Sequence, residues 1–172
     1  MPRVLSRFLL VLGLLTALLG GLTAGTAAAD DGAPYRILNN ATGGSLLPAG
    51  YGSDSSDGIL MYAWNPALTY GGDEWTFEDI GGSYLIRNTK TGKCLKPGGP
   101  WYGKTYVTQG ACNTGYEFQW WLQPRGSDGQ YKITSRSSHQ VMTPYYGSTV
   151  GEVVVLEPDS NIAKNWWSVT PV

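Results

Sequence analysis

The sequence is poor in the residues from which catalytic and metal sites are usually built. It has one histidine, His139, and two cysteines, Cys94 and Cys112. A Ser-His-Asp triad would have to use His139, which lies in a polar turn that reads as solvated rather than catalytic. Two cysteines and one histidine do not complete a tetrahedral zinc site. We therefore expect no catalytic residues, no enzyme activity, no metal and no other cofactor.

Clusters of basic residues and long helical patterns are also missing. Twelve Lys and Arg residues stand against 13 Asp and Glu residues, for a net charge of −1. This balance lacks the basic footprint that nucleic-acid phosphates require, so nucleic acid is not an expected partner. After residue 30 no stretch repeats apolar residues at helical spacing, and short alternating runs between Gly, Pro, Asn and Ser predict an all-β fold.

The first 29 residues differ from the rest of the chain. Arg3 and Arg7 precede an apolar run over residues 8–19, and small residues follow up to Ala29. That order is typical of a cleaved signal peptide, so we expect residues 1–29 to be removed and the mature protein to be secreted and extracellular. The alternative is a membrane anchor, but glycines interrupt the run, which falls short of the roughly 20 residues of a bilayer span. No other segment could span a membrane.

The two cysteines are expected to form a disulfide bond. A secreted chain passes through an oxidising compartment, where two cysteines pair by default. A bond between Cys94 and Cys112 closes a short loop and stabilises the fold by roughly 3 kcal/mol in the chain-entropy treatment.

One short unit occurs three times. Each copy opens with Tyr-x-Ile, continues through a polar turn and a second short strand, and then has a proline and an aromatic-glycine turn. The openings begin at Tyr35, Tyr84 and Tyr131, and the later turns contain Tyr51-Gly52, Trp101-Tyr102-Gly103 and Tyr145-Tyr146-Gly147. A third strand follows, and tryptophan closes each copy. Such spacing is the mark of a repeat architecture.

A unit of about 45 residues with four short strands cannot bury its own apolar face. Three copies must therefore share one core, which the closing tryptophans would fill. We expect one domain over residues 30–172, with repeats at about 35–80, 84–126 and 131–172.

The unit resembles the repeat of the ricin B-type lectins, which carries a glutamine-x-tryptophan signature near its end. The matching triplets are Asp73-Glu74-Trp75, Gln119-Trp120-Trp121 and Asn165-Trp166-Trp167, of which the middle one keeps the glutamine. The register at the two tryptophan pairs could also shift by one residue. This resemblance implies a β-trefoil with three pseudo-symmetric repeats, and the cysteines lie where the family often has a disulfide within one repeat.

The aromatic turns make carbohydrate the expected partner, because sugars stack their apolar faces on aromatic rings. Candidate platforms are Tyr51, Trp101, Tyr102, Tyr145 and Tyr146, although any of these rings could instead cover the open end of the barrel. In similar lectins an aspartate after the second strand binds sugar hydroxyls, whereas here Leu47, Lys96 and Thr143 occupy that position.

A later amide position in each repeat is better preserved, with Asn65, Asn113 and Asp159. These side chains either contact a ligand, as in the similar lectins, or cap turns. Two functions remain open. The first is a lectin-like module that uses aromatic platforms with a rearranged polar set, for instance Trp101 and Tyr102 with Asn113. The second is a protein-binding or receptor-binding trefoil, such as a toxin cell-binding subunit.

Overall fold

The computed structural model describes residues 32–172, and the expected signal peptide lies outside them. The described residues form twelve β-strands and four short 3-10 turns. The strands are β1 (Tyr35–Asn39), β2 (Ser45–Pro48), β3 (Met61–Trp64), β4 (Glu74–Asp79), β5 (Tyr84–Asn88), β6 (Cys94–Trp101), β7 (Lys104–Gly110), β8 (Gln119–Pro124), β9 (Gln130–Ser135), β10 (Val141–Pro144), β11 (Glu152–Glu157) and β12 (Trp167–Pro171). The 3-10 turns are η1 (Ala49–Gly52), η2 (Pro66–Leu68), η3 (Tyr116–Phe118) and η4 (Ala163–Asn165). No helix in this described part could span a bilayer.

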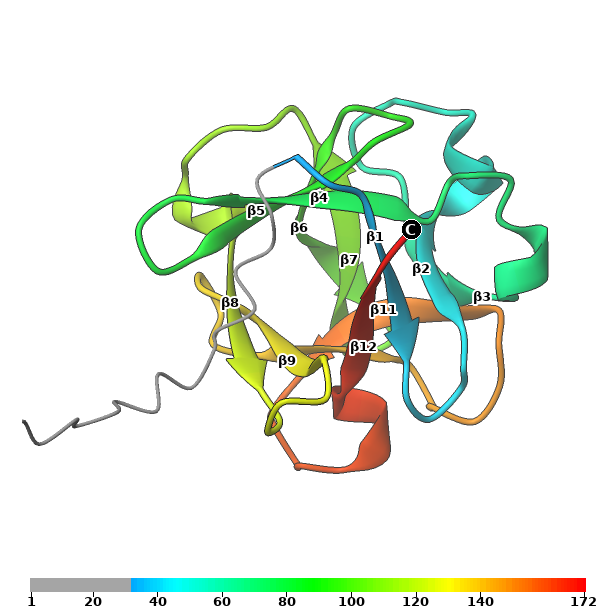
Figure 1. The fold of residues 1–172 in the computed structure, drawn as a ribbon, viewed down its shortest axis with the longest axis vertical. Coiled ribbons are helices and arrows are strands. Elements are labelled where there is room, and N and C mark those ends of the chain that lie inside the picture. Colours follow the sequence, from blue (N-terminus) through cyan, green and yellow to red (C-terminus); the bar gives the residue numbers. More distant parts are fainter. Residues whose placement is uncertain (1–31) are drawn as a thin grey trace, which may run out of the picture.

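Six strands close into a barrel. Strands β1, β4, β5, β8, β9 and β12 pair in that order, and β12 pairs again with β1, all antiparallel. In Figure 1 the first and last strands therefore run side by side. Because the ring is closed, none of the six strands is left as an unpaired edge.

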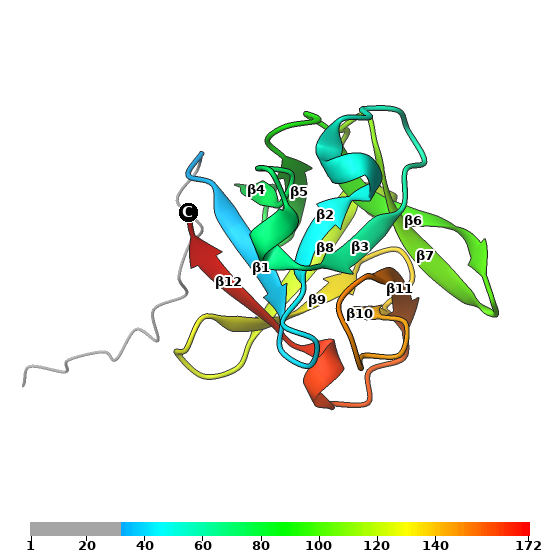
Figure 2. The ribbon, with the colours of Figure 1, turned by 90° about the vertical axis from the view of Figure 1, so that its right-hand side faces the viewer.

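The other six strands form three hairpins, β2–β3, β6–β7 and β10–β11. Strand β11 pairs with both β3 and β7, and a single bridge joins Leu60 to Thr108. The hairpins therefore hold each other together beside the barrel, and Figure 2 shows β6–β7 projecting furthest from the body. A closed six-stranded barrel with three hairpins, built from three four-stranded units, is the β-trefoil that the resemblance to the ricin B-type repeat implied.

The core has the same threefold pattern. The Tyr-x-Ile openings place Ile37, Ile86 and Ile133 in the interior, each with no exposed surface. Trp75, Trp120 and Trp167 are likewise fully buried. Their indole nitrogens donate to the backbone oxygens of the second strands, at Leu46 (2.8 Å), Leu95 (3.0 Å) and Met142 (2.8 Å). Each tryptophan thus joins the end of its unit to the middle of it while filling the shared centre.

The strand register corrects the signature triplets. Trp75, Trp120 and Trp167 lie opposite Tyr35, Tyr84 and Tyr131, so these three tryptophans are equivalent. The middle triplet is then Phe118-Gln119-Trp120, one residue earlier than the match Gln119-Trp120-Trp121. No repeat keeps glutamine at the first position. Phe118 instead packs with Leu85 and Cys94 in a small apolar cluster of its own.

The turns after the opening strands are also equivalent, as the repeats predicted. Gly43, Gly92 and His139 all have positive φ, at 67°, 69° and 58°. Each donates its backbone N–H to the residue four positions earlier, at 2.8–2.9 Å. His139 therefore occupies an exposed turn position that glycine fills in the other two repeats.

Candidate functional site

The β6–β7 hairpin is longer than its two counterparts, and a bulge with a close side-chain contact interrupts its pairing. The ring of Tyr106 lies across Gly98, where an added Cβ would come within 2.0 Å of a ring carbon. The register shifts between Pro97 and Pro100 at this point. Beyond the bulge β6 continues to Trp101, which was expected in a loop. The hairpin then ends in the two-residue turn Tyr102-Gly103.

In that turn the backbone of Tyr102 has a left-handed conformation, which is strained for a residue with a side chain. Tyr102 and Gly103 have φ of 46° and 82°, the pattern of a type I′ hairpin turn. The Tyr102 side chain is 82% exposed, and Trp101 packs edge-to-face against it at 5.4 Å. A left-handed tyrosine costs free energy, and such outliers gather at functional sites.

This tip meets the β10–β11 loop of the third repeat and forms a pocket of about 450 Å³. We call it the second aromatic pocket. Its lining includes Trp101, Tyr102, Tyr145, Tyr146, Gly151, Glu152 and Val153. Four of the five platforms expected from the sequence are therefore brought together, although they come from two different repeats.

Tyr145 forms the fixed wall of this pocket. Its hydroxyl donates to the backbone oxygen of Tyr102 (3.2 Å), and Lys104 places its ammonium 3.9 Å from the centre of the Tyr145 ring. The same ammonium donates to the Tyr145 backbone oxygen (3.1 Å). Tyr146 packs at 4.6 Å against Tyr145 but keeps 75% of its surface exposed. The pocket therefore combines an anchored ring with two accessible ones, Tyr146 and Tyr102.

Glu152 organises the loop that holds Tyr146. Its carboxylate accepts the backbone N–H groups of four consecutive loop residues, 146–149, at 2.7–3.0 Å. It also accepts the Ser148 hydroxyl at 3.0 Å. Partial burial opposes ionisation of this carboxyl, but the four N–H donors outweigh it and lower the pKa of Glu152 to about 2. Its oxygens are thus occupied within the loop.

Another pocket, of about 270 Å³, lies at the corresponding hairpin of the first repeat. We call it the first aromatic pocket. It is lined by Leu47, Pro48, Tyr51, Tyr62 and Trp64, among others. Tyr51, at φ 57°, packs edge-to-face with Trp64 at 6.1 Å, and Lys90 fixes the Tyr51 backbone oxygen at 2.9 Å.

Tyr62 and Trp64 were missed from the sequence, although a signal for them exists. The segment Met61-Tyr62-Ala63-Trp64 alternates, and Met61 and Ala63 are fully buried. Alternate residues of a strand point to opposite faces, so both rings must point outward.

The residues at the positions equivalent to the lectin aspartate make contacts within the protein. Leu47 is 2% exposed and forms part of the first aromatic pocket. The Lys96 ammonium lies 5.3 Å from the centre of the Phe118 ring, and the Thr143 hydroxyl donates to the Lys164 backbone oxygen (2.9 Å). Any sugar bound here would have to find hydrogen bonds elsewhere.

A third pocket, of about 640 Å³, is charged rather than aromatic. Glu157 lines it and forms ion pairs with Lys104 and Lys164. Burial raises the pKa of Glu157, but the two lysines outweigh that effect and hold it below its ordinary value. Its charges are mutually satisfied, so it offers a ligand less than the aromatic pockets do.

The three later amide positions cap turns. Asn65, Asn113 and Asp159 each accept the backbone N–H two residues ahead, at 3.0, 2.8 and 2.8 Å. Asp159 also pairs with Lys132, whose hydrogen bond lowers the pKa of Asp159 despite some burial. These bonds match the turn-capping alternative and hold the three side chains in their own turns.

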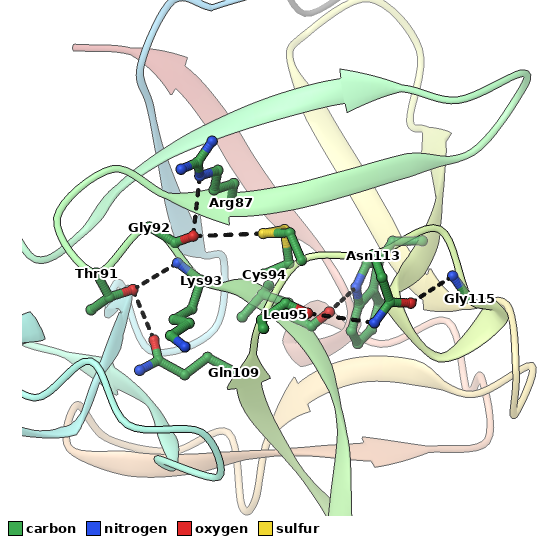
Figure 3. Close-up of a disulfide and its surroundings, with 12 residues drawn as sticks. Arg87, Thr91, Gly92, Lys93, Cys94, Leu95, Gln109, Asn113 and Gly115 are labelled. Carbon is green, nitrogen blue, oxygen red and sulfur yellow. Dashed lines mark hydrogen bonds between the residues drawn. A yellow bond between two sulfur atoms is a disulfide. The ribbon is translucent and has the colours of Figure 1, made fainter.

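The suggested grouping of Trp101 and Tyr102 with Asn113 is wrong. Asn113 follows the end of β7, where Gly110 pairs with Cys94, while Trp101 lies at the far end of the same hairpin. Figure 3 shows Asn113 beside the disulfide, with its oxygen directed to Gly115. Strand β6 is eight residues long, so its two ends lie about 23 Å apart.

The disulfide bond between Cys94 and Cys112 is present, as expected. It ties the start of β6 to the segment after β7, with the two Cα atoms 4.9 Å apart (Figure 3). It therefore fixes the base of the hairpin whose tip carries Trp101 and Tyr102. In the described part of the chain no three His, Cys, Asp or Glu side chains gather as a metal site.

Comparisons with known proteins agree with this geometry. A family model described as "Ricin-type beta-trefoil lectin domain-like" matches residues 72–157. No curated protein sequence matches the chain.

Several solved structures share the fold. A designed threefold-symmetric protein, ThreeFoil, is 22% identical with a TM-score of 0.73, over 81% of this chain and 99% of that one. An exo-β-1,3-galactanase from Clostridium thermocellum has the same identity and TM-score, over 83% of this chain but 31% of that one. A ricin B-like lectin from Macrolepiota procera, in complex with lactose, is 19% identical with a TM-score of 0.64, over 82% and 96%. At these identities the likeness establishes the fold.

Proposed function

Because the chain belongs to the ricin-type β-trefoil lectin domain-like family, we propose that it is a secreted carbohydrate-binding module without catalytic activity. The observation that carries this proposal is the gathering of aromatic rings in two pockets of the trefoil, where Tyr102 and Tyr146 are exposed and the other rings are partly exposed. Trp64 and Tyr51 define one pocket, and Tyr146, Tyr102 and Trp101 define the other. Sugars bury their apolar ring faces on such surfaces.

The hydrogen bonds to a sugar must differ from those made by lectins that have a carboxylate after the second strand. Leu47, Lys96 and Thr143 leave no such carboxylate, so stacking contributes the larger share of the binding free energy here. Backbone groups and tyrosine hydroxyls supply the remaining hydrogen bonds. The galactanase and the lactose-bound lectin make galactosides sensible first ligands to test.

A glycan array that includes galactosides, cellulose and chitin tests the proposal directly. We expect at least one glycan to bind, binding to be lost in Trp101→Ala or Trp64→Ala, and binding to persist in Lys96→Ala. Lys96 is the matched control because it occupies the aspartate-equivalent position outside both aromatic pockets. Silence across every glycan would overturn the proposal and favour a protein or receptor partner.

The absence of catalysis has its own test. The protein is incubated with the oligosaccharide that it binds best, and new reducing ends are measured over time. We expect none, because no acid–base pair or nucleophile was identified in the aromatic pockets. Release of reducing ends by the purified protein, abolished by Glu152→Gln, would contradict this part of the proposal.

A further inference from the structure

The two aromatic pockets share a wall. Gly151 lines the second pocket, and its N–H donates to the backbone oxygen of Ala63 at 2.6 Å. This bond lays the start of β11 against Trp64, which lines the first pocket. A Cβ at position 151 would lie 3.2 Å from a carbon of the indole, and the φ of 91° also disfavours a side chain there. Glycine is therefore what allows the two pockets to approach so closely.

The strand register joins the pockets at a second point. Strands β3 and β11 are antiparallel neighbours, with Tyr62 opposite Val153. Directly opposite residues in such a pair have side chains on the same face with Cβ atoms about 5 Å apart. Tyr62 belongs to the first pocket and Val153 to the second. The pockets therefore adjoin along the β3–β11 pair rather than lying on separate faces of the trefoil.

We propose that the two aromatic pockets form one elongated site that binds a neutral glycan chain along several consecutive sugar units. This inference rests on the carbohydrate-binding function proposed above and specifies its ligand. The rings follow one another across three repeats, from Tyr51 and Trp64 through Tyr146 to Tyr102. An array of this kind suits an extended polymer better than a single terminal sugar, since one sugar could occupy only one of the pockets.

The charges around the site favour a neutral ligand. Glu152 is the only carboxylate in the second pocket, and loop N–H groups and hydroxyls occupy its oxygens. Lys104 and Lys90 border the site: the Lys104 ammonium is engaged by Glu157 and by the carbonyl and ring of Tyr145, and the Lys90 ammonium donates to two backbone oxygens. These charged groups therefore already have hydrogen-bond partners within the protein, and a neutral chain needs no additional charge in order to bind.

The site is also organised before any ligand arrives. Tyr145 is fixed by Tyr102 and Lys104, and the loop from Tyr146 to Thr149 is fixed by Glu152. A prearranged surface loses less conformational entropy on binding. Affinity should therefore rise with each sugar unit added, until the chain covers both pockets.

The test is a chain-length series measured by titration calorimetry. Galactose and β-1,3-linked galacto-oligosaccharides of increasing length are compared with cello-oligosaccharides and chito-oligosaccharides of matched lengths. For at least one series we expect affinity to rise steeply with length and then to level off. For the longest ligand, Trp64→Ala and Tyr146→Ala should each weaken binding about tenfold, equivalent to about 1.4 kcal/mol.

Tyr116→Ala is the matched control, because Tyr116 is an exposed tyrosine that lines neither pocket. Thermal unfolding confirms that each variant is folded. Oligogalacturonides of the same lengths test neutrality, and they should bind more weakly than their neutral counterparts.

Failure of the elongated site can be distinguished from failure of the carbohydrate-binding function. If affinity does not depend on length, or Tyr146→Ala binds the longest chain like the parent while Trp64→Ala does not, the single elongated site is refuted and the carbohydrate-binding function stands. If no glycan of any length binds, both proposals fall. Equal or tighter binding of oligogalacturonides would refute the neutral ligand.

Discussion

The hydroxyl of Tyr145 donates a hydrogen bond to the backbone oxygen of Tyr102, 43 residues earlier in the chain. It links the tip of the second-repeat hairpin to the aromatic loop of the third repeat. Strands β7 and β11 pair close to the tip, at Thr105 and Leu156, but Tyr102 itself is held against the aromatic loop by this side-chain hydrogen bond.

Removing this hydroxyl should loosen the pocket without removing a ring. We expect Tyr145→Phe to weaken glycan binding about threefold to tenfold, since the Tyr102 wall is no longer held in place, while thermal stability changes little. Titration calorimetry and thermal unfolding measure the two effects. Tyr131→Phe serves as control because Tyr131 lies on β9, outside both aromatic pockets. Parent-like binding by Tyr145→Phe would show that the hydrogen bond does not shape the site.

Glu152 should support the loop over a wide range of pH. A glutamine cannot accept from four N–H groups as a carboxylate does, so Glu152→Gln should lower the free energy of unfolding by about 1 kcal/mol at pH 7 and weaken glycan binding. The pKa of Glu152 is lowered from 4.5 to about 2 in the folded protein. The stabilisation is therefore complete above pH 4.5 and is lost as the pH falls through about 2.

Urea unfolding of the parent and Glu152→Gln at several pH values checks this dependence. The difference between them should be constant from pH 7 to pH 5 and shrink below pH 4.5. Glu78→Gln is the control, since Glu78 is exposed on β4. A difference that disappears already at pH 6 would be inconsistent with the lowered pKa.

The tryptophan register can be tested with neighbouring residues. Trp120 is fully buried and donates to Leu95, while the adjacent Trp121 is partly exposed and packs near His139. Trp120→Phe should cost about 2–3 kcal/mol of unfolding free energy, because it leaves a cavity and an unpaired buried carbonyl. Trp121→Phe should cost less than about 1 kcal/mol. Urea denaturation would disprove this register if the order of the two losses were reversed.

The disulfide gives a prediction about mass and stability. The protein alkylated under denaturing conditions without reduction should keep its mass, and after reduction it should gain two alkyl groups. Removing the bond in the double variant Cys94→Ser, Cys112→Ser should lower the free energy of unfolding by about 3 kcal/mol. Two alkylated thiols in the unreduced protein would refute the bond.

The candidate site was only partly predictable from the sequence. The aromatic-glycine turns identified Tyr51, Trp101, Tyr102, Tyr145 and Tyr146, because rings beside glycine in a polar turn are seldom needed in the core. Trp64 was overlooked, since a tryptophan at a strand end reads equally well as core. The sequence also could not exclude a site that includes Asn113, because only the pairing of β6 with β7 places Trp101 and Asn113 at opposite ends of the hairpin.

What the sequence determined by itself was the threefold plan: the openings, the glycine and histidine turns and the disulfide pair follow from residue type and spacing. The loss of the lectin aspartate follows from the resemblance to the ricin B-type repeat. What the tertiary structure decided was which of two adjacent tryptophans faces inward and which loops of different repeats meet. Adjacent strand residues point to opposite faces, so a shift of one residue is invisible in composition and is fixed only by strand pairing. Contacts such as that of Gly151 with Trp64 join residues far apart in the chain, and they exist only once three units close around one core.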